Sequence, residues 1–366
     1  MQTNDPLPRT REERSNMKNI PSGSRGRIVR MVVVDLLAFG LALCIFAYFH
    51  HVRQPDTKPV MLPTPSQTAA PTIAPDVQAT PGPSTGDPGA TTSEQPAATP
   101  EPAGLLGAKY AEKFTAGEVV QDATSYRSAN VALELTQERR YDSLVHIVDI
   151  YLRDITSFHA VTCKEAFGEN LGIAAIGEAL PGALAISSSD QYRNRPSGQW
   201  GFIVNDGLLY SSDTNVYDFA VLYLDGTMEV YEAGTADFDS LVARGIRQAW
   251  TFGPALVKGG EAVGSYDGAP ARMQTNNPRV AIGYYEPGHY CLVMVDGTRA
   301  SNSGSKGATL DELTELFLSL GCTEALNLDG GSTVAMRFGS QTLNTSTRSL
   351  TNAIYISEPD TAQGGN

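Results

Sequence analysis

The sequence predicts a mixed α/β (α+β) domain that follows a transmembrane helix and a disordered stalk. Three observations support this prediction. One stretch of 19 residues is almost entirely apolar, the segment after it is rich in proline, and the remainder combines many strand patterns with one well-delimited helix. The expected organisation is a basic cytoplasmic tail at 1–30, a transmembrane helix at 31–49, a linker at 50–103 and a folded domain at 104–366 with its core at about 131–356.

The stretch from Met31 to Phe49 has the composition of a membrane-spanning helix. With a rise of about 1.5 Å per residue, it nearly spans a hydrocarbon core of roughly 30 Å. Seven Lys and Arg lie within residues 1–30, whereas only Arg53 and Lys58 follow the stretch closely. This asymmetry predicts a single-pass protein of the cell membrane with a cytoplasmic N-terminus and an extracellular C-terminal domain. A cleaved signal peptide is the alternative, but the apolar region is too long and no small-residue cleavage site follows it.

The segment after the predicted span has the composition of a disordered stalk. Residues 54–103 hold 12 prolines among Thr, Ala, Ser and Gly, and such a segment cannot bury enough apolar surface to fold.

The charge of the remaining chain limits its partners. Residues 104–366 carry 18 Lys and Arg against 31 Asp and Glu. This acidic balance argues against nucleic acid or an anionic lipid surface as a partner.

Strand patterns dominate from Val131 onward, and several are sharp. An Asp-Gly or Pro-Gly pair between two apolar runs is a strong hairpin signal. The expected elements, in order, are a half-buried strand at 143–154, a short helix at 171–180 that leads into the strand ALAIS, a hairpin at 219–232 turning at Asp225 and Gly226, and a hairpin at 279–297 turning at Pro287 and Gly288.

The best-defined element is a helix that begins after Thr309. Thr309 and Glu312 form a capping box, and Gly321 occupies the position of a left-handed cap. Strand patterns that end in Asp296 and Asp329 flank this helix. A strand-helix-strand unit predicts parallel, adjacent strands joined by a right-handed crossover. Since ligands bind at the carboxyl ends of such strands, both aspartates are expected at one edge, and the glycines after Asp329 are expected to let a substrate approach the backbone.

These aspartates suggest a chemistry. Two carboxylates converging on a cleft are the minimal equipment for glycoside hydrolysis, and Asp190 offers a third, with turn stabilisation as its alternative role. Arg279 lies at the mouth of a strand, where a guanidinium can hold a phosphate through two hydrogen bonds; a surface ion pair is the alternative. The five histidines show no metal-ligand spacing, and no P-loop, dinucleotide fingerprint or G-x-S-x-G motif occurs.

Three cysteines follow the predicted span. An odd number cannot all pair within one chain. If a pair forms, Cys291 with Cys322 is expected, because they lie at the starts of the two strands predicted to be neighbours. Buried free thiols are the alternative.

Four segments, taken in order, resemble the phosphodiester glycosidase family that includes N-acetylglucosamine-1-phosphodiester alpha-N-acetylglucosaminidase. The resemblance runs from about Val131 to Ile356. It is carried by HIVDIYLRDITSF, AWTFGPALVKGG, NPRVAIGYYEPGHYCLVMVDGTR and GATLDELTELFLSLGCTEALNLDGGSTVAM. The resemblance implies a mixed α/β domain that breaks the bond between the anomeric carbon of a sugar and a phosphate oxygen. The family's motif positions fall on Asp190, Arg279, Asp296, Asn327, Asp329, Gly330, Gly331, Ser332 and Thr333.

The resemblance implies roles for these residues. Asp329 is expected to act as base or nucleophile and Asp296 or Asp190 as acid. Arg279 and the backbone N–H groups around Gly331 to Thr333 are expected to cradle the phosphate. Asn205, in IVNDGLLY, adds a further candidate for substrate binding.

The chain departs from the family pattern at several positions. It has AISSSDQY where the family reads AINGDYY, and NLDGGSTVAM where the family reads NLDGGGSSTM. No arginine stands beside Asn205, and Asn352 occupies a position where aspartate is common. A side chain in place of a glycine narrows a pocket, and a missing cation weakens phosphate binding.

The leading hypothesis is a membrane-anchored enzyme that hydrolyses sugar-1-phosphodiesters of envelope or exopolysaccharide material. The alternative is a catalytically degenerate module that binds an envelope glycan or an anion. A structural wall-attachment protein is a third reading, supported by the stalk alone. No cofactor is predicted; clustered carboxylates at Asp190, Asp296 and Asp329 are compatible with a divalent cation.

Overall fold

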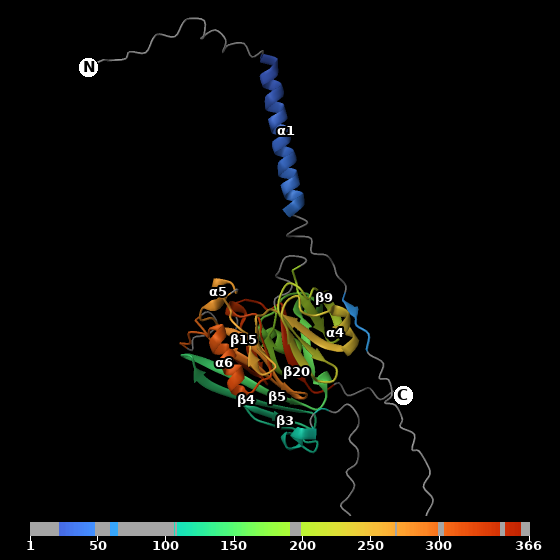
Figure 1. Ribbon diagram of the computed structural model, residues 1–366, viewed down its shortest axis with the longest axis vertical. Helices are drawn as coiled ribbons and strands as arrows, with labels where there is room; N and C mark the ends of the chain where they lie inside the picture. Colours follow the sequence, from blue (N-terminus) through green and yellow to red (C-terminus); the bar gives the residue numbers. More distant parts are fainter. Residues whose placement is uncertain are drawn as a thin grey trace, which may run out of the picture. The chain divides into compact units, whose positions relative to one another are not determined.

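The computed structural model describes residues 22–47, 59–64, 106, 108–190, 199–267, 269–298, 304–344 and 348–359. The chain divides into two compact units, residues 1–56 and 57–366. Helix α1 (Ser22–Ala47) is the described element of the first unit (Figure 1). It covers most of the predicted span, and Tyr48 and Phe49 lie outside the described residues. Among the described residues, no helix combines the length and the apolar character that crossing a membrane requires, so the predicted transmembrane helix is not supported.

Part of the predicted linker belongs to the second unit. Strand β1 (Val60–Met61) pairs with β9 (Leu208–Ser212), and the N–H of Leu62 donates to Gly207 O at 2.9 Å. Leu62 is partly buried against an apolar cluster of that unit. The prediction of a disordered linker was therefore wrong for residues 59–64. The remaining linker residues, 50–58 and 65–103, lie outside the described part of the chain.

Within the described residues, 20 strands form three sheets in which all paired neighbours are antiparallel. The nine-stranded sheet runs through β14 (Glu261–Ala262), β13 (Ala255–Lys258), β17 (Glu324–Asn327), β15 (Arg279–Glu286), β16 (His289–Val295), β5 (Ser143–Leu152), β4 (Val131–Arg140), β3 (Ser125–Arg127) and β2 (Val120–Gln121). The six-stranded sheet runs through β1, β9, β8 (Phe202–Asn205), β12 (Ile246–Thr251), β10 (Phe219–Tyr223) and β11 (Met228–Tyr231). The five-stranded sheet runs through β19 (Gln341–Asn344), β18 (Met336–Phe338), β7 (Ala183–Ser188), β20 (Asn352–Ser357) and β6 (Phe158–Thr162).

Helices are few and short in this unit, so the predicted mixed α/β class is confirmed with a strong excess of strand. The α-helices are α2 (Cys163–Phe167), α3 (Ile173–Ala179), α4 (Phe238–Arg244), α5 (Ala271–Gln274) and α6 (Leu310–Leu320), and the described 3-10 turns are η2 (Ala108–Lys113), η3 (Ile155–Ser157) and η5 (Gly331–Thr333).

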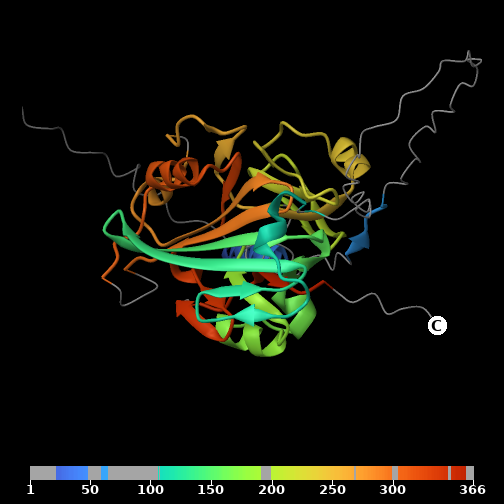
Figure 2. The same cartoon turned by 90° about the horizontal axis from the view of Figure 1, so that it is seen from below.

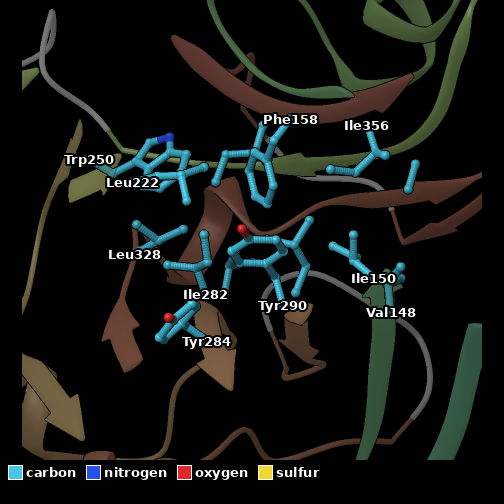
Figure 3. Close-up of a cluster of buried hydrophobic side chains, with 14 of the residues drawn as sticks. Val148, Ile150, Phe158, Leu222, Trp250, Ile282, Tyr284, Tyr290, Leu328 and Ile356 are labelled. Atoms are coloured by element: carbon cyan, nitrogen blue, oxygen red, sulfur yellow. The ribbon is translucent and has the colours of Figure 1, made fainter. Parts of the chain in front are cut away.

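One cluster of buried apolar side chains joins the three sheets (Figure 3). Val148 of β5 and Ile282 of β15 come from the nine-stranded sheet, Leu222 of β10 and Trp250 of β12 from the six-stranded sheet, and Ile356 of β20 from the five-stranded sheet. Burying apolar surface is the main favourable term in folding. The sheets of this unit therefore share a core.

Helix α6 covers the opposite face of the nine-stranded sheet. Figure 2 shows this helix, in orange, on one side of the long sheet and the red C-terminal strands on the other side. Its capping box and the left-handed Gly321 are present as predicted. Because both faces of the sheet are covered, Ile147 and Val148 are both buried although they point in opposite directions. The prediction of a half-buried strand at 143–154 was wrong for this reason.

The strands before and after α6 are parallel to each other but not adjacent. Strand β15 lies between β16 and β17 and pairs antiparallel with both. The predicted adjacency was wrong because the hairpin turning at Pro287 and Gly288 already places β15 beside β16. The crossover through α6 therefore ends one strand further along the sheet.

Several local predictions are confirmed. Strands β10 and β11 form the hairpin at Asp225 and Gly226, and α3 leads into β7. Cys163, Cys291 and Cys322 are buried free thiols. The Sγ atoms of Cys291 and Cys322 are 3.7 Å apart, whereas a disulfide bond measures about 2.05 Å. The two cysteines are thus neighbours without being bonded.

Candidate active site

A cavity of about 1020 Å³ opens at the end of the nine-stranded sheet where β17 finishes. Its charged lining residues are Asp218, Arg272, Arg279, Asp329 and Arg348. Its walls come from stretches within 216–218, 252–254, 265–279 and 329–332, together with Ala233, Thr298 and Arg348. Three arginines against two aspartates give this cavity a positive balance in a chain with a net charge of −13. A concentration of cations in a concave site favours an anionic ligand.

Asp329 lines this cavity and is 5% exposed. Its backbone N–H donates to Ser189 O at 3.0 Å, which ties the end of β17 to the end of β7. The hydroxyl of Thr333, one 3-10 turn later, donates to Asp329 Oδ2 at 2.5 Å. The motif residue Thr333 therefore holds the carboxylate in place, while Ser332 lines the cavity itself.

The two glycines after Asp329 allow close packing against β15. A Cβ atom on Gly330 would lie 2.6 Å from Pro278 O. Gly331 has a φ of +69°, a conformation that favours glycine, and its N–H donates to Pro278 O at 2.9 Å. That N–H is thus committed within the protein, contrary to its predicted place in a phosphate cradle. Both glycines line the cavity, where a ligand can lie against their backbone.

Arg279 is 3% exposed and lies in the wall of the cavity. Its Nε donates to Ala308 O at 2.9 Å, and its Nη2 donates to Met273 O at 2.6 Å and to Thr275 O at 3.0 Å. Burial lowers the pKa of Arg279 to about 10, so it stays charged at neutral pH. Its guanidinium holds backbone carbonyls of the protein, and this differs from the bidentate phosphate clamp that the sequence predicts.

Asp296 does not line the cavity with Asp329. Its Oδ1 accepts a hydrogen bond from Asn344 Nδ2 at 2.9 Å and lies 3.7 Å from His146 Nε2. All three side chains are buried. The sequence predicts that the two strand-ending aspartates face one cavity, and the structure brings only Asp329 to it.

Asp190 follows β7 and is also buried outside the cavity lining. Its Oδ2 accepts from the N–H of Thr251 at 3.2 Å, and its backbone O accepts from Thr351 Oγ1 at 3.2 Å. Because the preceding residue, Ser189, accepts the N–H of Asp329, the two aspartates belong to neighbouring chain segments. Asp190 therefore holds the end of β12, directly before the cavity-lining residues 252–254.

The two predicted asparagines do not line the cavity either. Asn327 is fully buried, and its Nδ2 donates to Gly253 O at 2.7 Å. Asn205 donates from Nδ2 to Thr162 Oγ1 at 2.8 Å. Each amide connects segments of different strands, so these side chains stabilise the scaffold around the site.

The family model of phosphodiester glycosidase matches residues 182–357. The resemblance to the phosphodiester glycosidase family is confirmed. This range contains the Asp329 loop, Arg279, Arg348 and every other described residue of the cavity lining.

Three further proteins are similar to this phosphodiester glycosidase-like chain. The SPbeta prophage-derived uncharacterized protein YomE of Bacillus subtilis (strain 168) is 33% identical over 168 residues, which are 44% of this chain and 26% of that protein. The zebrafish N-acetylglucosamine-1-phosphodiester alpha-N-acetylglucosaminidase catalytic domain, auto-inhibited by its pro-peptide, has a TM-score of 0.49 and 15% identity over 62% of this chain and 83% of that chain. A hypothetical protein from Synechocystis has a TM-score of 0.42 and 14% identity over 63% of this chain and 62% of that chain.

Sequence reasoning missed several charged residues of this cavity. Arg348 and Arg272 line it together with Asp329. The two oxygens of Asp218 accept the N–H groups of Ala233 and Ala255, both at 2.9 Å, so Asp218 connects two walls. Asp218 directly precedes a strand, whereas the aspartates singled out from the sequence follow strands, so that signal did not include Asp218. The arginines carry no local signal, because isolated arginines between strand patterns are common in any sequence.

Within the described residues, no group of three His, Cys, Asp or Glu side chains is arranged to hold a metal ion. Asp190, Asp296 and Asp329 have different hydrogen-bond partners. The prediction that no cofactor is required stays a prediction.

Proposed function

We propose that this chain hydrolyses the bond between the anomeric carbon of a sugar and an oxygen of a phosphodiester. One observation carries the proposal: the carboxylate of Asp329 lines a cavity with three arginines, inside the segment that matches the phosphodiester glycosidase family. The carboxylate suits chemistry at the anomeric carbon, and the arginines suit the charge of the phosphate. Sugar-1-phosphodiesters of envelope or exopolysaccharide material are the proposed substrates.

The reaction needs only one carboxylate at the anomeric carbon, because the phosphate leaves without being protonated. Asp329, acting as base, accepts a proton from water while the water oxygen bonds to the anomeric carbon. The phosphate monoester leaves with the electron pair of the broken bond. Because a phosphate monoester is a good leaving group, its departure requires positive charge more than a proton, and the arginines of the cavity provide that charge. This assignment replaces the predicted acid role of Asp296 or Asp190. With Asp329 as nucleophile, the same arginines stabilise the same leaving group.

The test follows the release of reducing sugar from a panel of UDP-sugars and sugar-1-phosphate diesters by the full-length chain. Asp329→Asn keeps an oxygen acceptor for Thr333 but removes the charge and the basicity. We expect it to lower kcat/KM by roughly 10²–10⁴-fold. Asp239→Asn, on the exposed side of α4, is the matched control and retains activity. Equal activity of Asp329→Asn and the parent chain would exclude Asp329 from the reaction.

A second candidate is a module that binds a glycan or an anion without turnover. The observation that favours it is the absence of Asp296 and Asp190 from the described lining of the cavity. The same panel separates the candidates. Saturable binding of a sugar-1-phosphate diester by calorimetry, with no sugar released from any substrate, would support the binding module and exclude the enzyme.

We also propose that residues 31–49 attach the chain to the cell membrane and that residues 57–366 lie on its extracellular side. The charge asymmetry around Met31 to Phe49 supports this proposal. A protease added to intact cells is expected to degrade the second unit and to spare a tag at the N-terminus. Protection of the second unit in intact cells would place it on the other side.

A further inference from the structure

Arg272 lines the cavity from the short helix α5 and has an exposed side chain. Within the part of the chain that the structure describes, its guanidinium makes no hydrogen bond or ion pair. By contrast, the Nε and Nη2 groups of Arg279 donate hydrogen bonds to the carbonyls of Ala308, Met273 and Thr275. Arg272 is thus a cation of the cavity that remains available to a ligand.

The position of Arg272 is fixed relative to Asp329 by a chain of contacts. The guanidinium of Arg279 bonds the carbonyl of Met273, the residue next to Arg272. The residue before Arg279, Pro278, accepts the N–H of Gly331 at 2.9 Å. Asp329 lies two residues before Gly331 in the same loop. A buried charged side chain therefore connects the wall that carries Arg272 to the loop that carries the proposed reactive carboxylate.

The cavity is also larger than one sugar phosphate requires. Its volume of about 1020 Å³ lies at the upper end of the roughly 300–1,000 Å³ range of pockets that hold drug-sized ligands. The wall near Arg272 includes Tyr266, whose hydroxyl is hydrogen-bonded to Thr314 Oγ1 of α6 at 2.5 Å. Tyr217 lines the cavity as well. Aromatic rings offer apolar faces to sugars, and an arginine offers a bidentate partner for a phosphate.

We propose that Arg272, Tyr266 and Tyr217 form a subsite for the leaving portion of the substrate, and that this subsite binds the next sugar phosphate unit of an anionic oligomer. The proposal rests on the proposed function and specifies its substrate class. The phosphate at the scissile bond lies near Asp329. The following phosphate bonds to Arg272, and the sugar between them lies against the aromatic side chains. Arg279 acts as a positioning residue for Arg272.

The test compares two substrates with the same scissile bond in the full-length chain. One is a sugar-1-phosphate methyl diester, and the other is a trimer of that sugar joined through 1-phosphodiester bonds. The parent chain is expected to have the higher kcat/KM on the trimer. Arg272→Gln is expected to reduce the ratio of the two kcat/KM values by about tenfold through KM, the loss of one charge-assisted contact. Arg272→Lys keeps the charge and is expected to retain part of the preference.

Arg127→Gln is the control, because it removes the same charge from an exposed position on β3 and is expected to keep the ratio unchanged. An unchanged ratio in Arg272→Gln, or equal kcat/KM of the parent chain on both substrates, would overturn the subsite while the proposed function stands. Failure to hydrolyse either substrate would overturn the proposed function itself. A UDP-sugar that depends on Arg272 while the trimer does not would reassign the subsite to a nucleotide.

Discussion

Arg279 illustrates how a buried charged side chain can organise the wall of a cavity. Its buried guanidinium satisfies the carbonyls of Met273 in α5, of Thr275 just after α5, and of Ala308 just before α6. Hydrogen bonds to a charged group contribute more than neutral ones, and a buried carbonyl that loses its donor carries the cost of its own desolvation. The loops around Arg272 therefore depend on the fork of donors that arginine alone provides.

Arg279→Lys is expected to lower the free energy of unfolding by about 2–4 kcal/mol, because one ammonium group cannot reach three carbonyls in this geometry. Urea denaturation followed by tryptophan fluorescence measures the change. Arg127→Lys, at an exposed position, is the control and is expected to stay within about 0.5 kcal/mol of the parent chain. A similarly small change in Arg279→Lys would show that the three carbonyl contacts do not stabilise the fold.

Single residues of the site were predictable where the signal is local. The Asp329 loop stands out because a carboxylate, two glycines and two hydroxyls follow an apolar run, and the cavity indeed forms there. Asp296 ends an equally apolar run, yet its carboxylate is bonded to Asn344 and lies near His146. These partners are distant in sequence, so no local pattern distinguishes an aspartate that lines a cavity from one buried beneath it.

At the scale of elements, features set by neighbouring residues could be predicted, whereas the order of strands in a sheet could not. The ends of helix α6 were predictable to the residue, because Thr309 and Glu312 form its capping box and Gly321 its left-handed cap. The order of strands around it was not. Whether β17 pairs with β16 or with β15 depends on which strand already occupies the edge of β16, and that is decided by the hairpin at residues 286–289.

Burial on both faces of a strand is likewise a property of the assembled layers. Strand β5 has apolar residues at most positions, and the sequence predicts that only one of its two faces is buried. The structure buries Val145 and Ile147 as well, because α6 and β15 to β17 build a second cluster on that side. A covering helix 160 or so residues later in the chain leaves no trace in the alternation of the strand itself.

For the whole molecule, the boundary of the folded unit is the most consequential difference between sequence and structure. Composition places the start of the domain at residue 104, after the last of the clustered prolines. The structure places β1 of residues 60–61 on the edge of the six-stranded sheet and Leu62 against its apolar cluster. Two proline-flanked residues can add to an edge strand because an edge position requires only one side of their backbone to be paired.

A chain that begins at Thr57 is therefore expected to be more stable than one that begins at Gly104. Loss of β1 exposes the hydrogen-bonding edge of β9 and the side of the cluster that Leu62 covers, and burying a side chain of this kind contributes about 1–2 kcal/mol. Urea denaturation of the two chains measures the difference in the free energy of unfolding. Leu62→Ala in the longer chain isolates the packing contribution from that of the edge. Equal free energies of unfolding of the two truncated chains would show that β1 does not stabilise the sheet. The folded domain would then begin at residue 104, where composition alone places it.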